Sequence, residues 1–332
     1  MSDALKIAVL GSNSFSGASF SAYALERGAE VLGMSRSTEP HHAFLPYRWD
    51  GRETGFRFFP YDLNKDIDKI IALVAKEKPR YFVNFAAQSM VGQSWETPED
   101  WFMTNVVSNV KLHNRLRGFD FLERYVHITT PEVYGGTEGF VAEDAPFNPS
   151  TPYAVSRAAA DMSLRTFFDA YDFPVVFTRA ANVYGPGQLL YRIIPRTILF
   201  LKLGKTLSLH GGGVSRRSFI HIRDVSKATW KVMSEGKLGA TYHISTNEIV
   251  SIRQLVESIC EKMGASFEES VQVSEDRLGK DSAYLLDSGK IRAELDWRDE
   301  ITLDQGLDAC IAWVEDNLGV LKDQPFDYVH RP

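Results

Sequence analysis

The stretch KIAVLGSNSFSG, residues 6–17, decides how the rest of this 332-residue chain is interpreted. A short apolar strand, 6–11, runs directly into a loop with the spacing G-x-x-S-x-x-G and then into a helix predicted over 15–27. Gly11 permits a tight turn, and Gly17 lets the helix pack closely on the strand. Because unpaired N–H groups at the start of a helix attract phosphate, the loop predicts a site for the pyrophosphate of a dinucleotide.

The middle position of this loop holds Ser14, where dinucleotide-binding loops often carry another glycine. A serine narrows the approach of the backbone to the ligand, but its hydroxyl is a candidate to bond a phosphate oxygen. The other interpretation of the loop is a simple strand-to-helix turn without a ligand. The candidate cofactor residues of this segment are Gly11, Asn13, Ser14, Phe15, Ser16 and Gly17.

Strand and helix patterns alternate through the first half of the chain. The later strands are predicted over 30–35, 56–62, 81–87, 124–130 and 174–180, and the helices between them over 67–76, 99–117 and 153–171. Strands joined by helices of this length favour right-handed crossovers and a parallel sheet covered on both faces. The predicted fold class is therefore α/β, a Rossmann-type doubly wound sheet that binds ligands at the carboxyl ends of its strands.

The regular alternation of strands and helices ends after residue 182. Gly/Pro turns, a helix near 192–203 and a predominance of helices further on indicate a smaller, mostly helical C-terminal part that binds the substrate. We expect residues 1–182 to form the dinucleotide-binding domain, with 217–245 returning to it. The second domain is expected to comprise residues 183–216 and 246–332.

The composition is that of an ordinary globular protein, with 44% hydrophobic and 24% charged residues and a net charge of −6. No lysine- or arginine-rich stripe interrupts this acidic balance, which argues against a nucleic-acid partner. No apolar run reaches the roughly 18 residues that a membrane span needs. Cys260 and Cys310 have no metal-binding spacing, which is typical of plain thiols in a reducing compartment. We expect a soluble cytoplasmic protein without a metal site.

The end of the second strand bears on the form of the cofactor. An NAD site usually places a carboxylate there, whereas an NADP site prefers a cation. Here Arg36 stands between Ser35 and Ser37 without a carboxylate, which favours NADP over NAD. Both cofactors remain open, because Arg36 also fits a solvated loop charge. The ends of the third and fourth strands add the cofactor candidates Asp62, Leu63, Ala86, Ala87 and Gln88.

Five segments together resemble the extended short-chain dehydrogenases/reductases that modify nucleotide sugars. They are NFAAQSMVGQSWETPEDWFMTNV (84–106), TTPEVYG (129–135), PSTPYAVSR (149–157), RAANVYGPGQ (179–188) and RRSFIHIRDV (216–225). The resemblance covers nearly the whole chain and is greatest to nucleotide-sugar 4,6-dehydratases, those of GDP-mannose and dTDP-glucose included. It implies an NAD- or NADP-dependent lyase that acts on a nucleotide-diphosphate sugar.

The resemblance places the family's catalytic tyrosine at Tyr153, in a motif that reads Y-x-x-x-K in the family and ends in Arg157 here. An arginine keeps the positive charge that lowers the pKa of the phenol and bonds the nicotinamide ribose, but its fork is bulkier and differently directed. Thr130 corresponds to the hydroxyl that bonds the substrate at C4, and Glu132 to the base that removes the C5 proton. Many dehydratases carry an aspartic acid between them, whereas Pro131 cannot donate a proton.

The implied reaction is a 4,6-dehydration, in which Tyr153 takes part in oxidation at C4, Glu132 removes the C5 proton and water leaves from C6. Because the acid is missing, other activities stay open: the chain could be an epimerase, a UDP-glucuronate-type decarboxylase or a dehydratase that forms a 5,6-ene. A non-catalytic NADP-binding sensor is the alternative of another class. Arg157 and Ser14 favour the sensor, while Tyr153 and Glu132 weigh against it.

The family's substrate contacts map onto Gln88, Ser89, Thr130, Asn182, Arg217 and Arg277. Each arginine suits a phosphate because its fork bonds two oxygens at once, although a solvated surface charge is the alternative. Asp224 is expected to cap a helix that starts at Val225, and His127 is expected to be a hydrogen-bonded core residue. Family members dimerise through the helices at 99–117 and 153–171, so the resemblance implies a homodimer.

Overall fold

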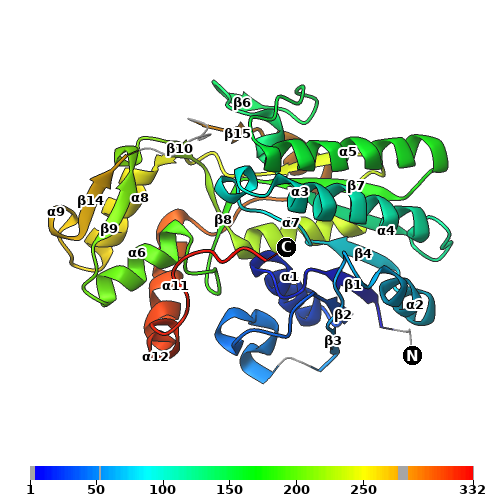
Figure 1. Ribbon diagram of the computed structural model, residues 1–332, viewed down its shortest axis with the longest axis horizontal. Helices are drawn as coiled ribbons and strands as arrows, with labels where there is room; N and C mark the ends of the chain where they lie inside the picture. Colours follow the sequence, from blue (N-terminus) through cyan, green and yellow to red (C-terminus); the bar gives the residue numbers. More distant parts are fainter. Residues whose placement is uncertain (1–3, 52–53, 276–282, 332) are drawn as a thin grey trace.

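The computed structural model of the protein describes residues 4–51, 54–275 and 283–331. Its centre is a sheet of seven strands in the order β12-β7-β5-β4-β1-β2-β3 (Figure 1). The strands are β1 (Lys6–Leu10), β2 (Glu30–Met34), β3 (Phe56–Phe59), β4 (Tyr81–Asn84), β5 (Arg124–Thr129), β7 (Val175–Ala180) and β12 (Thr241–Ile244). Every neighbouring pair in this sheet is parallel, which confirms the predicted Rossmann-type fold.

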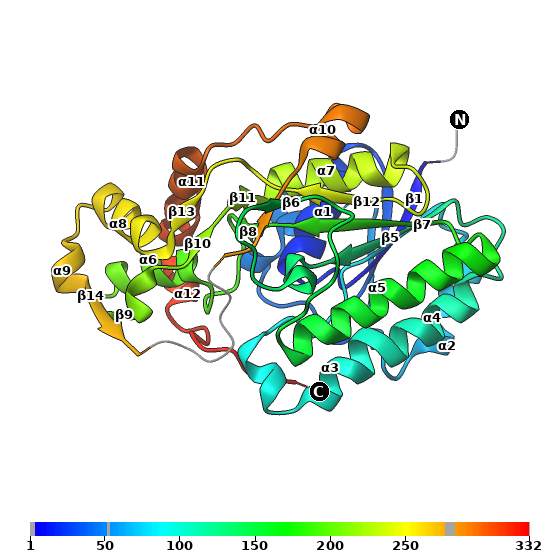
Figure 2. The same ribbon diagram turned by 90° about the horizontal axis from the view of Figure 1, so that it is seen from above.

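Helices cover both faces of the sheet (Figure 2). Successive side chains of a strand point to opposite faces, so Ile7 enters one apolar core and Ala8 the other. The first core also holds side chains of α1 (Phe15–Glu26) and α7 (Ile222–Glu235). The second core holds side chains of α2 (Ile67–Glu77), α4 (Asn109–Leu116) and α5 (Pro152–Tyr171). This double burial explains why the strands read as continuous apolar runs.

The helix predicted over 99–117 consists of three pieces. A π-helical stretch, Met103–Ser108, joins α3 (Pro98–Phe102) to α4. Within this wider stretch, the Asn105 side chain accepts a 2.8 Å hydrogen bond from the Gln88 amide and donates a 3.0 Å bond to the Gln88 carbonyl. The widened turns therefore hold the backbone just beyond β4, in keeping with the frequent use of such turns at functional sites.

The remaining elements include a smaller body at one end of the sheet (Figure 1). The short strands pair as β8 (Asn182–Tyr184) with β11 (Phe219–His221), β9 (Leu207–His210) with β14 (Val271–Ser274), β10 (Arg216–Arg217) with β13 (Val250–Ser251), and β6 (Phe140–Val141) with β15 (Leu285–Leu286). The helices are α6 (Ile193–Lys202), α8 (Ile252–Lys262), α9 (Phe267–Ser270), α10 (Gly289–Leu295), α11 (Leu303–Asp316) and α12 (Leu318–Leu321). Helices α6, α8, α11 and α12 share one apolar core, which makes this body mostly helical.

The predicted role of Asp224 as a helix cap is wrong. Helix α7 begins at Ile222, and its cap is His221, whose side chain accepts a hydrogen bond from the amide of Arg223. The Asp224 carboxylate instead accepts a 3.0 Å bond from the amide of Ile301. Asp224 therefore ties the first turn of α7 to the loop that precedes α11.

Three observations bear on the class of protein. Over the ranges that the structure describes, no helix is long and apolar enough to cross a membrane. In the same ranges, no group of three or more His, Cys, Asp or Glu side chains is placed to hold a metal ion. Cys260 and Cys310 are both buried and free, so neither thiol lies at the surface.

Gly11 provides a stability test of the close approach between β1 and β4. A Cβ there would lie 2.8 Å from the amide nitrogen of Ala86, and φ is +84°. Gly28 is the matched control, since its φ is +77° but a Cβ would meet nothing within 4 Å. Gly28→Ala should lower the free energy of unfolding by about 1–2 kcal/mol through backbone strain alone, and Gly11→Ala by a further ~1–3 kcal/mol through overpacking. Equal losses in urea denaturation would contradict the assigned contact.

Candidate active site

The glycine loop has a conformation that suits a dinucleotide. A Cβ on Gly17 would lie 2.2 Å from the carbonyl oxygen of Gly11, so this position requires glycine. The Ser14 hydroxyl caps α1, because it accepts a 3.1 Å bond from the Gly17 amide and donates a 2.7 Å bond to the Gly11 carbonyl. Ser14 thus bonds the loop itself, and the amides at the start of α1 are left as the groups that fit a pyrophosphate.

The three predicted residues after β2 lie beside this loop. The Ser35 hydroxyl accepts a 2.9 Å bond from the Asn13 amide, and the Ser37 carbonyl accepts a 3.1 Å bond from the Asn13 side chain. Arg36 is exposed, and its Nη1 donates a 2.7 Å bond to the carbonyl oxygen of Arg331. Arg36 therefore contacts a distant part of the chain as well as standing at the glycine loop.

The residues predicted at the end of β3 have structural contacts. The Asp62 carboxylate accepts a 2.8 Å bond from the Asn64 amide, which is the arrangement of a turn aspartate. Leu63 is buried in one of the two cores beside the sheet. Neither contact assigns a cofactor role, so the cofactor roles of Asp62 and Leu63 stay predictions.

The residues predicted beyond β4 approach the glycine loop from the other side. Ala86 and Ala87 are half-buried there, and Ala86 lies against Gly11. Gln88 is buried, and its side-chain Nε2 donates a 2.7 Å bond to the same Arg331 carbonyl that Arg36 bonds. Ser89, by contrast, is exposed.

Thr130, Glu132 and Tyr153 meet at the carboxyl end of β5. Thr130 is extended and caps a 3₁₀ turn, η5 (Pro131–Tyr134), in which proline takes the first position, where an amide donor is not needed. The Thr130 hydroxyl donates to the Glu132 carboxylate, and the Thr130 side chain also lies next to the phenol of Tyr153. The proline thus fixes the turn that aims Thr130 and Glu132 at the tyrosine, which lies in the first turn of α5.

The environment of Tyr153 opposes its ionisation. Burial, reinforced by the nearby Glu132 carboxylate, raises the pKa of the phenol to about 12. The charge of Arg157 and the contact with Thr130 act in the opposite direction. The predicted lowering of the phenol pKa by Arg157 is therefore present but is outweighed by burial, so the phenol is protonated at neutral pH.

Arg157 lies on the buried side of α5. Its Nη2 donates to the carbonyl oxygen of Ile128, while its buried Nε has no hydrogen-bond partner among the described residues. Asp161, one turn further along α5, bonds Arg179 at 2.8 Å and lies 3.4 Å from Nε2 of His127. His127 is thus buried in the core, as predicted, but neither of its ring nitrogens has a hydrogen-bond partner among the described residues, so the predicted hydrogen bonding is not found. A buried donor without a partner is costly, and the Nε of Arg157 is such a donor.

Two of the predicted substrate residues form a cluster with a tyrosine that the sequence did not single out. Tyr284 donates a 2.8 Å bond to Asn182, and the guanidinium of Arg217 lies 4.4 Å from the centre of the Tyr284 ring. Burial raises the pKa of Tyr284, and the Glu132 carboxylate acts in the same direction. The cluster therefore lies near the Glu132 carboxylate.

A second residue missed in the sequence is Arg192, whose charge lowers the pKa of both Tyr153 and Tyr284. Neither Arg192 nor Tyr284 stands in a recognisable motif, so only their position in space reveals them. Arg277, the other predicted phosphate partner, lies outside the described residues, and its role stays a prediction.

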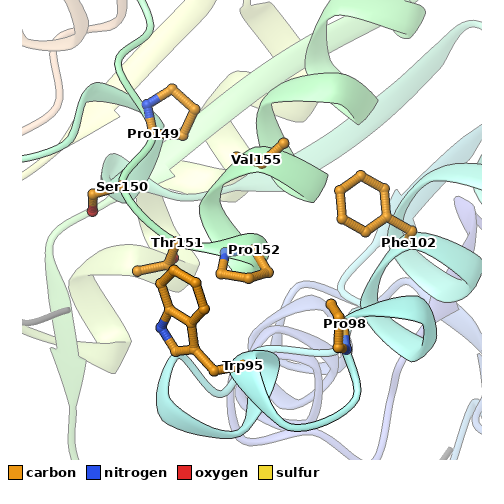
Figure 3. Close-up of a pocket in the computed structure, with 8 residues that line it drawn as sticks. All are labelled: Trp95, Pro98, Phe102, Pro149, Ser150, Thr151, Pro152 and Val155. Carbon is orange, nitrogen blue, oxygen red and sulfur yellow. The ribbon is translucent and has the colours of Figure 1, made fainter. Parts of the chain in front are cut away.

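An open apolar hollow adjoins the start of α5 (Figure 3). Its lining comes from two segments, around η3 (Gly92–Trp95) with α3 and around the start of α5, and comprises Trp95, Pro98, Phe102, Pro149, Ser150, Thr151, Pro152 and Val155. Trp95 is 55% exposed and Phe102 37%. The hollow belongs to the outer surface of the helices that were predicted to dimerise, and none of Thr130, Glu132 and Tyr153 lines it.

Comparison with known proteins places this site in a family. The sequence model of the GDP-mannose 4,6 dehydratase family matches residues 9–310. The dTDP-glucose 4,6-dehydratase of Xanthomonas campestris pv. campestris (strain B100) is 29% identical over 324 residues, which cover 92% of each chain. A trifunctional protein of Arabidopsis thaliana, named UDP-glucose 4,6-dehydratase, 3,5-epimerase and reductase, is 30% identical over 266 residues. That match covers 79% of this chain but only 40% of the larger protein.

The solved structures agree with the sequence relatives. The crystal structure of the dTDP-glucose 4,6-dehydratase from Streptomyces venezuelae, with NAD bound, is 30% identical to this chain. The two superpose with a TM-score of 0.85 over 95% of this chain and 98% of the other. The fold, the match to the family and the cluster of Thr130, Glu132 and Tyr153 lead to one conclusion: the chain belongs to the GDP-mannose 4,6-dehydratase family of extended short-chain dehydrogenases/reductases, an enzyme family of nucleotide-sugar dehydratases with epimerase relatives.

Proposed function

We propose that this chain is a nucleotide-sugar 4,6-dehydratase. The observation that carries the proposal is the meeting of Thr130, Glu132 and Tyr153 at the carboxyl end of β5, two strands from β1 and its glycine loop. A hydroxyl, a carboxylate and a phenol in contact supply the proton transfers of an oxidation followed by an elimination. A sensor that only binds a dinucleotide has no need of this cluster.

The nicotinamide of the bound cofactor would accept hydride from C4 and return it at C6. Tyr153, once deprotonated, takes the proton of the 4-hydroxyl, and the Thr130 hydroxyl holds the oxygen at C4. The ketone at C4 acidifies the hydrogen at C5, which the Glu132 carboxylate removes. Arg157 is assigned to a ribose hydroxyl of the cofactor, and it keeps a positive charge near the phenol.

Pro131 removes the usual donor for the departing 6-hydroxyl. Glu132 can return the C5 proton to that oxygen itself, or a hydroxyl or water can carry it; the Thr130 hydroxyl already contacts the Glu132 carboxylate. If no proton reaches the 6-oxygen, deprotonation at C5 leads to an epimer instead. The product distinguishes these outcomes, because dehydration lowers the mass of the sugar by one water and epimerisation leaves it unchanged.

The substrate is proposed to be a nucleotide-diphosphate sugar, in keeping with the named substrates of the relatives. Arg217 is the described arginine that we assign to its phosphates, with Arg277 as the second. Asn182 and Tyr284 are assigned to neighbouring oxygens, because they bond each other next to Arg217. Gln88 and Ser89 are assigned to the sugar side of the site. The division into a dinucleotide domain and a sugar domain stays part of this proposal.

The cofactor is proposed to be a nicotinamide dinucleotide. Arg36 between Ser35 and Ser37 supports NADP, whereas the NAD found in the Streptomyces enzyme supports NAD. A titration with each cofactor decides between them. We further infer that the enzyme works in the cytoplasm, an inference supported by its two buried free thiols.

A homodimer through α3, the π-helical stretch and α5 is also proposed. Several large apolar side chains are exposed there, which is unusual for a surface that stays in water. Met162 is 61% exposed and Met103 46%, and they are accompanied by the hollow of Figure 3.

Substitutions at two positions should separate the two halves of the reaction. Tyr153→Phe should slow oxidation at C4 by about 10²–10⁴-fold, because the proton acceptor is lost, while NAD binding persists. The Glu132→Gln variant should oxidise C4 but fail to remove the C5 proton, so that reduced nicotinamide accumulates without loss of water. Absorbance and mass spectrometry follow the two steps. Tyr171→Phe, an exposed position on the same helix, is the control. Normal turnover by Tyr153→Phe would refute the assignment.

The proposed dimer can be broken by one charge on its apolar surface. Met103→Asp should shift the sedimentation coefficient from that of two chains to that of one, since a buried unpaired carboxylate is costly. Leu238→Asp replaces a side chain that is 39% exposed outside this surface and should leave the assembly unchanged. Wild-type protein that sediments as a single chain would contradict the proposal.

A further inference from the structure

The segment that follows α12 crosses from the helical body to the sheet. We call residues 324–331 the bridging segment; it is the red trace that leaves α12 and ends beside α3 in Figure 2. At its start, Arg196 of α6 donates a 3.2 Å hydrogen bond to the carbonyl oxygen of Phe326 and forms a 3.1 Å salt bridge with Asp327. Its first residues are therefore held on the helical body.

The far end of the bridging segment is held on α3. His330 contacts the Asp100 carboxylate at 2.7 Å through Nε2 and stacks on Trp101, with ring centres 4.8 Å apart and planes 17° apart. Trp101 is fully buried, so its ring is a fixed platform. Tyr328, in between, packs its ring edge-on against Tyr191 at 5.5 Å. Three side-chain contacts thus set the course of the segment.

The carbonyl of Arg331 contacts residues that follow the strands on both sides of β1. It accepts 2.7 Å bonds from Nη1 of Arg36, which follows β2, and from Nε2 of Gln88, which follows β4. Strand β1, which carries the glycine loop, lies between β2 and β4 in the sheet. One backbone oxygen therefore bridges the two sides of the glycine loop, at the carboxyl ends of the strands where the fold binds its ligands.

The two donors on this oxygen are both residues that were predicted to face the cofactor. A dinucleotide presents oxygens of the same kind, as ribose hydroxyls and phosphates, in that place. We propose that the bridging segment is an internal competitor of the cofactor: its Arg331 carbonyl occupies the Arg36 and Gln88 donors, and the dinucleotide must displace it to bind. This inference rests on the proposed dinucleotide site.

In molecules where the Arg331 carbonyl is displaced, which we call open, the cofactor can bind. Competition of this kind therefore reduces the apparent affinity for the cofactor in proportion to the fraction of molecules that are open. The contacts of His330 with Asp100 and Trp101 stabilise the closed arrangement without touching the glycine loop. Loosening that anchor should therefore raise the open fraction and tighten cofactor binding. If the segment instead contacted the bound cofactor and held it in place, loosening the anchor would weaken cofactor binding.

The test is isothermal titration of NAD and of NADP into the 332-residue chain and its variants. His330→Ala should lower the dissociation constant of the preferred cofactor by about fivefold or more. A chain that ends after Asp327 retains the ion pair with Arg196 but lacks the Arg331 carbonyl, and it should bind at least as tightly as His330→Ala. Val329→Ala, at a 63% exposed position of the same segment, is the control and should bind like the wild type.

Two results would overturn the inference while leaving the proposed function intact. One is an unchanged dissociation constant in both His330→Ala and the shortened chain. The other is weaker binding in both, with melting temperatures equal to that of the wild type. Failure of the wild-type protein as well as the shortened chain to bind either cofactor would instead remove the dinucleotide site itself, and with it both proposals.

Discussion

The placement of one phenol in the interior of the protein is the constraint on which the rest of the site depends. Burial strengthens the electrostatic contacts of Tyr153 with its neighbours, but it also raises the pKa of the phenol to about 12. The contact with Thr130 and the charge of Arg157 act against that increase, and both depend on the position of β5 beside α5. The sheet, the start of α5 and the turn at Pro131 therefore bring three groups close to the phenol oxygen of Tyr153. These are the Thr130 hydroxyl, the Glu132 carboxylate and the Arg157 cation.

Much of this arrangement could be predicted from the sequence, because its signals are local. The run into the glycine loop predicts β1 and α1, and the steric need for glycine at position 17 is a contact within that loop. Strands buried on both faces read as apolar runs, so the order of elements follows from pattern alone. Thr130, Glu132 and Tyr153 stand in short motifs, and the structure brings these three together.

The features that could not be predicted depend on contacts between distant segments. Tyr284 reaches Asn182 from about a hundred residues away, and nothing in its own surroundings marks it. Asp224 resembles a helix cap in sequence, yet the helix starts earlier, at Ile222. The Asp224 carboxylate instead accepts a hydrogen bond from the amide of Ile301. The bond between Arg36 and the Arg331 carbonyl joins the second strand to the bridging segment, and no periodicity predicts such a pairing. The net pKa of Tyr153 likewise depends on burial, which residue types alone do not give.

The central claim is that Tyr153 acts as a base whose pKa the Arg157 cation lowers. The most direct measurement is the rate of C4 oxidation in single turnovers as a function of pH, in the wild type and in Arg157→Gln, with Arg165→Gln as a control on the same helix. The rate should rise with pH by up to about tenfold per unit, because it follows the phenolate. In Arg157→Gln the rise should lie at higher pH, since removing the cation raises the pKa of the phenol. Identical pH profiles for the wild type and Arg157→Gln, or a rate that does not change with pH, would contradict the account.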